Sequence, residues 1–345
     1  MIDQSKFIKA LNKEINTTPP IWYMRQAGRY LPEYRKIRSK FKNFLDMCKD
    51  PDVCCELALQ PIERFNLDAS ILFSDILTIP DAFNLGVEFK EGEGPVFKNP
   101  IRTIQDIENL PRFNEMELSY VYKCVENIRR ALPKDLPLIG FCGSPWTLAA
   151  YSIEGGSSKE FAFTKNFIRQ NPLQTKNLLK IYTDSCFKYL KEQVNAGVNA
   201  IQIFDSWANL LDEKDYKSYS LFYINELVRQ LKNDPITKKI PVIVFARQPK
   251  SGIEQLIDCK PDCISLYWDE SIDDSIKLLK NKTAIQGSFN PSILKEDNSI
   301  IYEEVKTMIE KFRGYPGYIF NLGHGITPDI NPDKVKFLTD SVRGL

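Results

Sequence analysis

The sequence predicts an α/β fold, a single (β/α)8 barrel of the TIM type that spans residues 1–345 as one domain. Two observations predict it. Short apolar runs bounded by turn residues recur along the chain, with helix-like stretches between them, and eight such alternations fit a barrel. The runs are apolar throughout rather than alternating, as parallel strands are when helices cover both faces of the sheet.

The expected strands are apolar runs of five or six residues, and they span 20–24, 69–73, 137–142, 200–204, 241–246, 263–267, 283–287 and 318–322. The clearest helices between them span 51–65, 119–132, 171–197 and 299–312. Residues 85–113 contain GVEFKEGEGPVFKNP, which predicts a small hairpin insertion outside the barrel. A doubly wound open sheet is the alternative arrangement of the same elements.

Composition excludes several classes of protein. Lys and Arg number 46 against 45 Asp and Glu, and this balance argues against a protein that binds nucleic acid or a membrane surface. No apolar run approaches the roughly 18 residues of a membrane span, and the first residues lack a signal-peptide core, so we expect a cytoplasmic protein. The eight cysteines contain no C-x-x-C pair and His324 is the only histidine, so we expect core thiols and no metal.

The active site of such a barrel lies at the carboxyl ends of its strands. Arg25 and Arg29 come directly after the first expected strand, on either side of Gly28, within a basic stretch that continues to residue 42. The basic residues of 35–42 suit a solvated helix face. A guanidinium beside a buried strand is costly without an anionic partner, so Arg25 and Arg29 are predicted to bind a carboxylate or phosphate.

Other polar residues follow the remaining strands. His324 stands between two glycines, where the backbone lets a ligand approach closely, and this favours a cleft residue over a core one. Asp75 either caps the next helix or points into the cleft, and the sequence leaves both open. Tyr151 similarly fits packing or function. Ser206 has no general base near it in sequence, so its hydroxyl is expected to donate a hydrogen bond rather than attack.

Five segments together resemble the uroporphyrinogen decarboxylase family. They are PPIWYMRQAGRYLPEYR (19–35), FSDILTIPDA (73–82), GFCGSPWTLAAYSIEGG (140–156), FDSW (204–207) and NLGHGI (321–326). The first and third match the two long signatures of the family, and the resemblance runs from about residue 5 to the carboxyl terminus. It implies a homodimeric barrel without metal or cofactor that removes carbon dioxide from the four acetate side chains of uroporphyrinogen, giving coproporphyrinogen.

The resemblance also implies the site residues. Asp75 matches the aspartate at the pyrrole nitrogens, and a catalytic role is implied for Asp75, Arg25, Tyr151 and His324. The substrate-binding residues are these four together with Gln26, Ala27, Gly28, Arg29, Phe204 and Ser206. The chain departs from the family at the rim of the cleft, where it has Ala208-Asn209, Arg247-Gln248-Pro249-Lys250, Tyr267 in place of the usual Asp, and Ser288-Phe289-Asn290-Pro291.

The chemistry suits an ionised carboxylate. Loss of carbon dioxide needs an electron sink, and protonation of the pyrrole carbon that bears the acetate supplies one. Asp75 would stabilise the resulting cation through the pyrrole N–H groups. The proton donor stays open between an arginine and His324.

Two other functions compete with this one. The first is a cobalamin-dependent methyltransferase-like barrel, which would bind zinc through a histidine and cysteines. His324 lacks the cysteines that such a zinc site would need. The second is a non-catalytic tetrapyrrole-binding protein.

Overall fold

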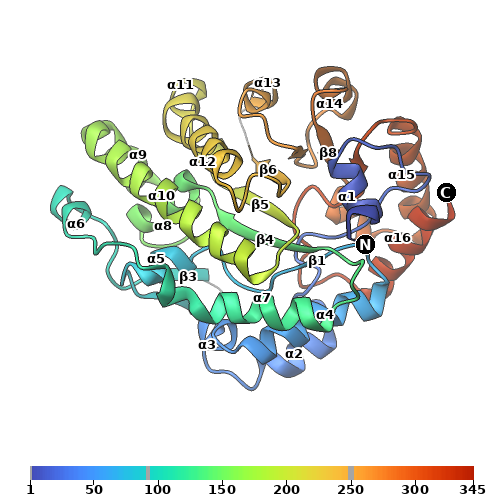
Figure 1. The fold of residues 1–345 in the computed structure, drawn as a ribbon, viewed down its shortest axis with the longest axis horizontal. Helices are drawn as coiled ribbons and strands as arrows, with labels where there is room; N and C mark the ends of the chain where they lie inside the picture. Colours follow the sequence, from blue (N-terminus) through green and yellow to red (C-terminus); the bar gives the residue numbers. More distant parts are fainter. Residues whose placement is uncertain (1, 91–93, 248–251) are drawn as a thin grey trace.

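Parallel strands form a curled sheet surrounded by helices in the computed structural model (Figure 1), which describes residues 2–90, 94–247 and 252–345. The described sheet is seven-stranded and runs in the order β1-β4-β5-β6-β7-β8-β9. Its strands are β1 (Ser70–Ile71), β4 (Leu138–Gly143), β5 (Ala200–Asp205), β6 (Val242–Ala246), β7 (Cys263–Ser265), β8 (Ala284–Gln286) and β9 (Tyr318–Ile319). Residues 91–93 of the predicted insertion and residues 248–250 of the predicted rim lie outside the described residues.

The described α-helices pack around the strands. They are α1 (Lys6–Leu11), α2 (Pro32–Arg38), α3 (Phe44–Cys48), α4 (Pro51–Phe65), α5 (Thr78–Ala82), α6 (Ile104–Glu108), α7 (Ser119–Ala131), α8 (Pro145–Glu154), α9 (Ala162–Gln170), α10 (Pro172–Ala196), α11 (Glu213–Asp215), α12 (Phe222–Asn233), α13 (Gly252–Ile257), α14 (Ile272–Leu279), α15 (Asn298–Lys311) and α16 (Pro332–Gly344). The four helices named from the sequence are confirmed as α4, α7, α10 and α15, with bounds within a residue of those predicted.

Strand order confirms the TIM-like fold class. Each sheet strand pairs in parallel with the next one along the chain, from β1 with β4 to β8 with β9. A doubly wound sheet would instead reverse its order at one strand. The alternative arrangement is therefore wrong.

The first predicted strand, 20–24, is wrong as a strand, although the segment lies where the barrel needs it. Ile21 forms one parallel bridge with Phe320, and its carbonyl accepts a hydrogen bond of 2.8 Å from the N–H of Asp68. Pro19 and Pro20 lack N–H donors, so no ladder extends before Ile21. After Ile21, the N–H of Met24 donates a hydrogen bond of 3.0 Å to Asn321 Oδ1. A side-chain oxygen therefore takes the place of the backbone carbonyl of a neighbouring strand.

Side chains fill the interior of the barrel below the site. Phe7, Ala10 and Leu11 of α1 are buried against Ile139, Ala200 and Ile319 of the strands. Above them, Trp22 Nε1 donates to Gln286 Oε1 at 2.8 Å. This packing closes one end of the barrel, which leaves the carboxyl ends of the strands to form a site.

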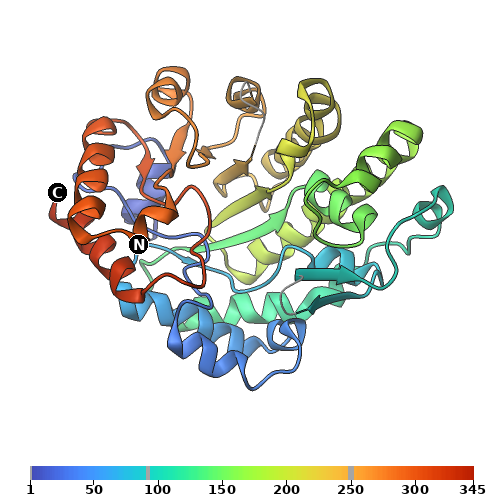
Figure 2. The same ribbon diagram turned by 180° about the vertical axis from the view of Figure 1, so that it is seen from behind.

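The predicted insertion contains a two-stranded antiparallel hairpin, β2 (Val87–Lys90) and β3 (Gly94–Phe97), seen best from behind (Figure 2, teal). Val96 bridges to Gly156, and the N–H of Phe97 donates to the carbonyl of Gly155 at 3.0 Å. These contacts fix the hairpin to the chain that leaves α8.

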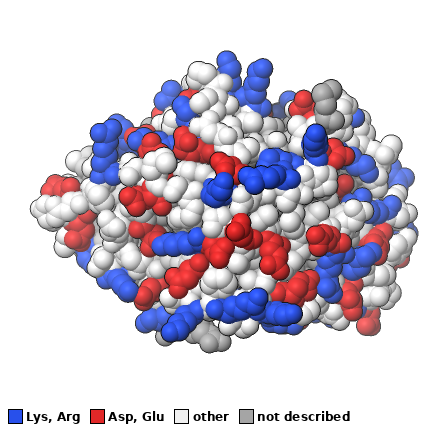
Figure 3. Space-filling view, turned by 60° about the horizontal axis from the view of Figure 1, so that its bottom comes forward, with Lys and Arg blue, Asp and Glu red and all other residues white. Residues whose placement is uncertain are grey.

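The charged surface agrees with the balanced composition. Basic and acidic side chains are interspersed over the face shown in Figure 3. Within the part of the chain that the structure describes, no helix is both long enough and apolar enough to cross a bilayer.

Candidate active site

A cavity of about 330 Å³ opens at the carboxyl ends of the strands and contains most of the predicted site. Its walls include eight of the ten predicted residues: Arg25, Gln26, Ala27, Asp75, Tyr151, Phe204, Ser206 and His324. The remaining walls are mostly apolar and come from residues such as Phe73, Ile76, Phe141 and Phe245. Asp75 is the only carboxylate among the described lining residues, so the cavity combines one acid with two bases in an apolar surround.

Asp75 points into the cleft, one of the two interpretations that the sequence left open, and the helix-cap interpretation is wrong, because the N-cap residue of α5 is Leu77 and no side chain caps that helix. Its Oδ1 accepts a hydrogen bond of 2.8 Å from the N–H of Leu77, which shapes the turn into α5, and its side chain also lines the cavity. Burial raises the pKa of Asp75 to about 6, against the opposing effects of the Leu77 N–H and the charge of Arg25. A carboxylate in this setting is ionised at pH 7, and a positive charge placed beside it would strongly stabilise the ionised form.

The two glycines beside His324 leave room for their neighbours, the Arg25 side chain at Gly325 and the Trp268 backbone at Gly323. A Cβ atom on Gly325 would lie 2.6 Å from Cγ of Arg25, and one on Gly323 would lie 2.6 Å from Cα of Trp268. The N–H of Ile326 donates to the carbonyl of Met24 at 3.1 Å and joins the two loops. The two glycines around His324 are therefore required by packing of the site loops.

The burial argument for Arg25 and Arg29 is wrong, because both residues are exposed. Arg25 still lines the cavity, and its backbone adopts a left-handed φ of 61°. Neither Gly28 nor Arg29 lines the cavity; the carbonyl of Arg29 accepts from Arg35 Nη1 at 2.8 Å. Arg29 is thus an exposed residue outside the cavity wall.

Tyr151 and Ser206 enter the cavity from α8 and from the end of β5. The Tyr151 ring meets the Trp207 ring edge-on at 5.8 Å and the Phe161 ring at 6.1 Å, which fixes its orientation. Burial, and in smaller part the charge of Asp75, raise the pKa of Tyr151, so its phenol stays protonated at neutral pH. Ser206 is half-buried and lines the same cavity.

Sequence reasoning missed Asp205, which stands between two predicted site residues. Asp205 is fully buried, and its Oδ1 accepts from Ser144 Oγ at 2.6 Å and Thr147 Oγ1 at 2.9 Å. The hydroxyl of Ser220 donates to its other oxygen. This network joins the end of β5 to the start of α8 and so positions Ser206 relative to Tyr151. The FDSW segment was the available signal, because its acid follows a buried strand.

The environment of His324 favours the neutral imidazole. Burial first, and the charges of Arg25 and Arg247 after it, lower the pKa of His324 below its ordinary 6.5. The ring also meets the Tyr267 ring edge-on at 6.1 Å. At pH 7 the imidazole is therefore uncharged and able to donate one hydrogen bond and accept another.

The hairpin forms its own sheet outside the barrel, as predicted, and it also contributes to the site. Phe89 and Pro95 line the cavity. The Phe89 ring packs against Phe44 at 4.9 Å, and Phe44 packs in turn against Phe73 at 6.2 Å. The insertion leaves the barrel at the carboxyl end of β1, the end at which βα loops build sites.

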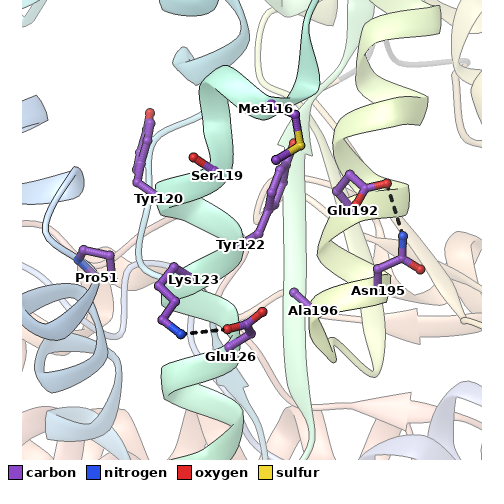
Figure 4. A pocket seen from close by; sticks show the side chains of 10 residues that line it. All are labelled: Pro51, Met116, Ser119, Tyr120, Tyr122, Lys123, Glu126, Glu192, Asn195 and Ala196. Atoms are coloured by element: carbon purple, nitrogen blue, oxygen red, sulfur yellow. Dashed lines mark hydrogen bonds and ion pairs between the residues drawn. The ribbon is translucent and has the colours of Figure 1, made fainter.

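A larger hollow of about 560 Å³ lies away from these residues, between α7 and α10 (Figure 4). Its charged groups are paired: Lys123 Nζ lies 3.0 Å from Glu126, and Asn195 Nδ2 donates to Glu192 at 3.1 Å. None of the predicted site residues lines it. Among the described residues no group of three or more His, Cys, Asp and Glu could hold a metal ion.

Comparison with known proteins decides the family. Residues 3–345 match the sequence profile of uroporphyrinogen decarboxylase (URO-D). The chain belongs to the uroporphyrinogen decarboxylase family. It is 46% identical over 337 residues to the uroporphyrinogen decarboxylase of Ruthia magnifica, with 97% of each chain covered. It is 45% identical to that of Legionella pneumophila (strain Paris), with 99% of this chain and 97% of the relative covered.

Solved structures agree on the fold. A methyltransferase from Methanosarcina mazei has a TM-score of 0.80 at 17% identity, covering 98% of this chain and 97% of its own. A putative vitamin-B12-independent methionine synthase from Listeria monocytogenes has a TM-score of 0.55 at 14% identity, covering 95% and 99%. At such identities these likenesses show the barrel alone.

Proposed function

We propose that this chain decarboxylates uroporphyrinogen to coproporphyrinogen in the cavity around Asp75, Arg25, Tyr151 and His324. The activity is assigned because residues 3–345 match the uroporphyrinogen decarboxylase family. One observation supports this cavity as the active site. Eight of the ten site residues that the family resemblance implies line it, at the carboxyl ends of the strands. Phe204 and Ser206 are proposed to contact the substrate from β5, and Gln26 and Ala27 from the loop that carries Arg25.

Asp75 is proposed to stabilise the positive charge of the intermediate. A proton adds to the pyrrole carbon that bears the acetate, and the ring becomes cationic. The electron pair of the bond to the carboxyl carbon then moves into the ring as carbon dioxide leaves. The exocyclic carbon takes up a proton to become a methyl group, and the ring carbon releases its own, so each acetate consumes one proton. Asp75 opposes the cationic ring in an apolar wall, where its charge acts strongly.

Arg25 and His324 are the two candidate proton donors. Because burial and two neighbouring arginines lower the pKa of His324, the imidazole holds no extra proton at neutral pH. This favours Arg25 as the donor and gives His324 a hydrogen-bonding role towards substrate. Tyr151, held by the Trp207 and Phe161 rings, is proposed to hydrogen-bond to substrate with its protonated phenol. Arg29 and Gly28 are proposed to act at the entrance, where Arg29 attracts the carboxylates of the incoming substrate.

Assembly and location rest on the family resemblance. We propose a cytoplasmic homodimer in which residues 1–345 form one catalytic domain and no metal or cofactor takes part. Sedimentation at micromolar concentration should give twice the chain mass of 39.8 kDa. A single species at the chain mass would contradict the dimer.

Anaerobic incubation of the purified chain with uroporphyrinogen tests the activity. We expect release of carbon dioxide and formation of coproporphyrinogen, and we expect EDTA to leave the rate unchanged. Binding without carbon dioxide release would show a tetrapyrrole-binding protein instead. A rate that EDTA abolishes and zinc restores would favour the chemistry of the methyltransferase-like alternative.

A further inference from the structure

Arg247 follows β6, two residues after the cavity-lining Phe245, and is not itself one of the described residues that line the cavity. Its guanidinium carbon lies 4.9 Å from the centroid of the Tyr267 ring. The side chain is half-buried, and among the described residues no ion pair joins it to a carboxylate. Its backbone N–H donates to the carbonyl of Asp205 at 3.0 Å, which fixes the residue to the end of β5.

Tyr267 connects Arg247 to the candidate site. Its buried ring packs against Phe245, a cavity-lining residue, at 6.5 Å, and it meets the His324 ring edge-on at 6.1 Å. Arg247 is also close enough to His324 for its charge to disfavour the protonated imidazole, as the charge of Arg25 does. His324 therefore lies within the influence of two arginines, one from the loop after Met24 and one from the loop after β6.

Among the described residues, the side-chain contact that the structure gives Arg247 is with Tyr267 rather than with a carboxylate. The Tyr267 ring supplies an aromatic face, which holds the guanidinium by a cation–π contact and occupies none of its N–H donors. A half-buried guanidinium with unused donors is suited to a carboxylate ligand, because paired N–H···O bonds offset its loss of water.

We propose that Arg247 forms a second carboxylate subsite of the cavity, which binds an acid side chain of the substrate, and that Tyr267 is the positioning residue that holds it. This inference rests on the proposed function, since it assumes that the polycarboxylate lies in the same cavity as Asp75. It assigns a binding role to a position where the sequence suggested only a departure from the family.

Arg247→Gln tests the subsite. The substitution removes the charge and keeps much of the side chain length, so we expect KM for uroporphyrinogen to rise about tenfold with kcat largely retained. The control is Arg313→Gln, which removes an exposed arginine after α15 and should leave both constants unchanged. Tyr267→Leu should raise KM in the same direction, and the conservative Tyr267→Phe should restore it because the ring face remains.

The single histidine supplies an independent check of the geometry. In an NMR titration of the imidazole protons, Arg247→Gln should raise the pKa of His324, whereas Arg313→Gln should not. This shift together with a raised KM supports the subsite. A folded Arg247→Gln variant with an unchanged KM would overturn the proposal, whatever happens to His324. If the unsubstituted chain released no carbon dioxide, the failure would belong to the proposed function instead.

Discussion

Arg25 shows how the site loops hold a side chain against the ordinary preference of the backbone. Its left-handed φ of 61° costs roughly 1 kcal/mol or more for a residue other than glycine. Gln26, which is fully buried, offsets this cost because its Oε1 accepts from the N–H of Tyr23 and its carbonyl accepts from the Tyr30 hydroxyl at 2.7 Å. Gln26 therefore anchors the loop in addition to lining the cavity, and Arg25 is the residue that the loop presents.

Substitution of Arg29 and of Arg25 should distinguish a residue that acts at the entrance of the cavity from one that acts in its wall. Arg29→Ala should raise KM several-fold and leave kcat largely intact, because an entrance charge aids binding before and after the chemical step alike. Arg25→Gln should lower kcat as well, because Arg25 lines the cavity. Steady-state kinetics of both variants check this. An Arg29→Ala variant with normal KM and collapsed kcat would move Arg29 into the chemistry.

The rate should depend on pH through Asp75. Its raised pKa of about 6 means that kcat/KM should fall as pH drops through about 6, where the carboxylate of the free enzyme becomes neutral. From pH 7 to 8 the rate should stay level, because His324 is already neutral there. A steep decline between pH 6 and 8 would instead identify a protonated His324 as the donor.

Single residues were predicted to different degrees. The glycines around His324 identified a cleft residue correctly, because close approach is a local property of the chain. Burial of Arg25 and Arg29 was predicted wrongly, since the segment before them makes a bridge and a turn rather than a strand. Asp205 was missed because its partners Ser144, Thr147 and Ser220 come from other elements.

At the scale of elements, periodicity predicted the long helices well and the short strands less well. α4 begins where predicted, since Asp50 Oδ1 accepts from the N–H groups of Asp52 and Val53 and Pro51 occupies the first turn. β1 is only Ser70–Ile71, although an apolar run covers 69–73. Hydrophobicity marks burial along such a run, but the hydrogen-bond partners that define a strand depend on neighbours far away in sequence.

The attachment of the hairpin gives a prediction at this scale. A Cβ atom on Gly156 would lie 2.6 Å from the carbonyl oxygen of Pro95, so Gly156→Ala must push β3 away from its bridge. Because Phe89 and Pro95 line the cavity, KM should rise several-fold while unfolding free energy falls by about 1–2 kcal/mol. Gly344→Ala is the matched control, since nothing lies near its added Cβ atom. An unchanged KM in Gly156→Ala would remove the hairpin from the site.

At the scale of the whole molecule, the ionised carboxylate of Asp75 lowers the free energy of unfolding. The pKa of Asp75 is higher in the folded chain, about 6, than its ordinary 3.8, so the folded state binds this proton more tightly than the unfolded state. Above pH 6 the ionised group therefore lowers stability, by at most about 3 kcal/mol, and this cost disappears as pH falls from 6 towards 4. Replacement of Asp75 by a neutral residue should stabilise the protein at pH 8 and lose that advantage at pH 4.

Turnover and thermal stability of one Asp75→Asn preparation at pH 8 test the central claim most directly. Asn keeps the shape and accepts from the N–H of Leu77 about as well as Asp, so the turn into α5 should persist. We predict a melting temperature equal to or above that of the unsubstituted chain, with turnover reduced roughly a hundred- to a thousandfold because the charge opposite the cationic ring is gone. A folded Asp75→Asn protein with near-normal turnover would contradict the account.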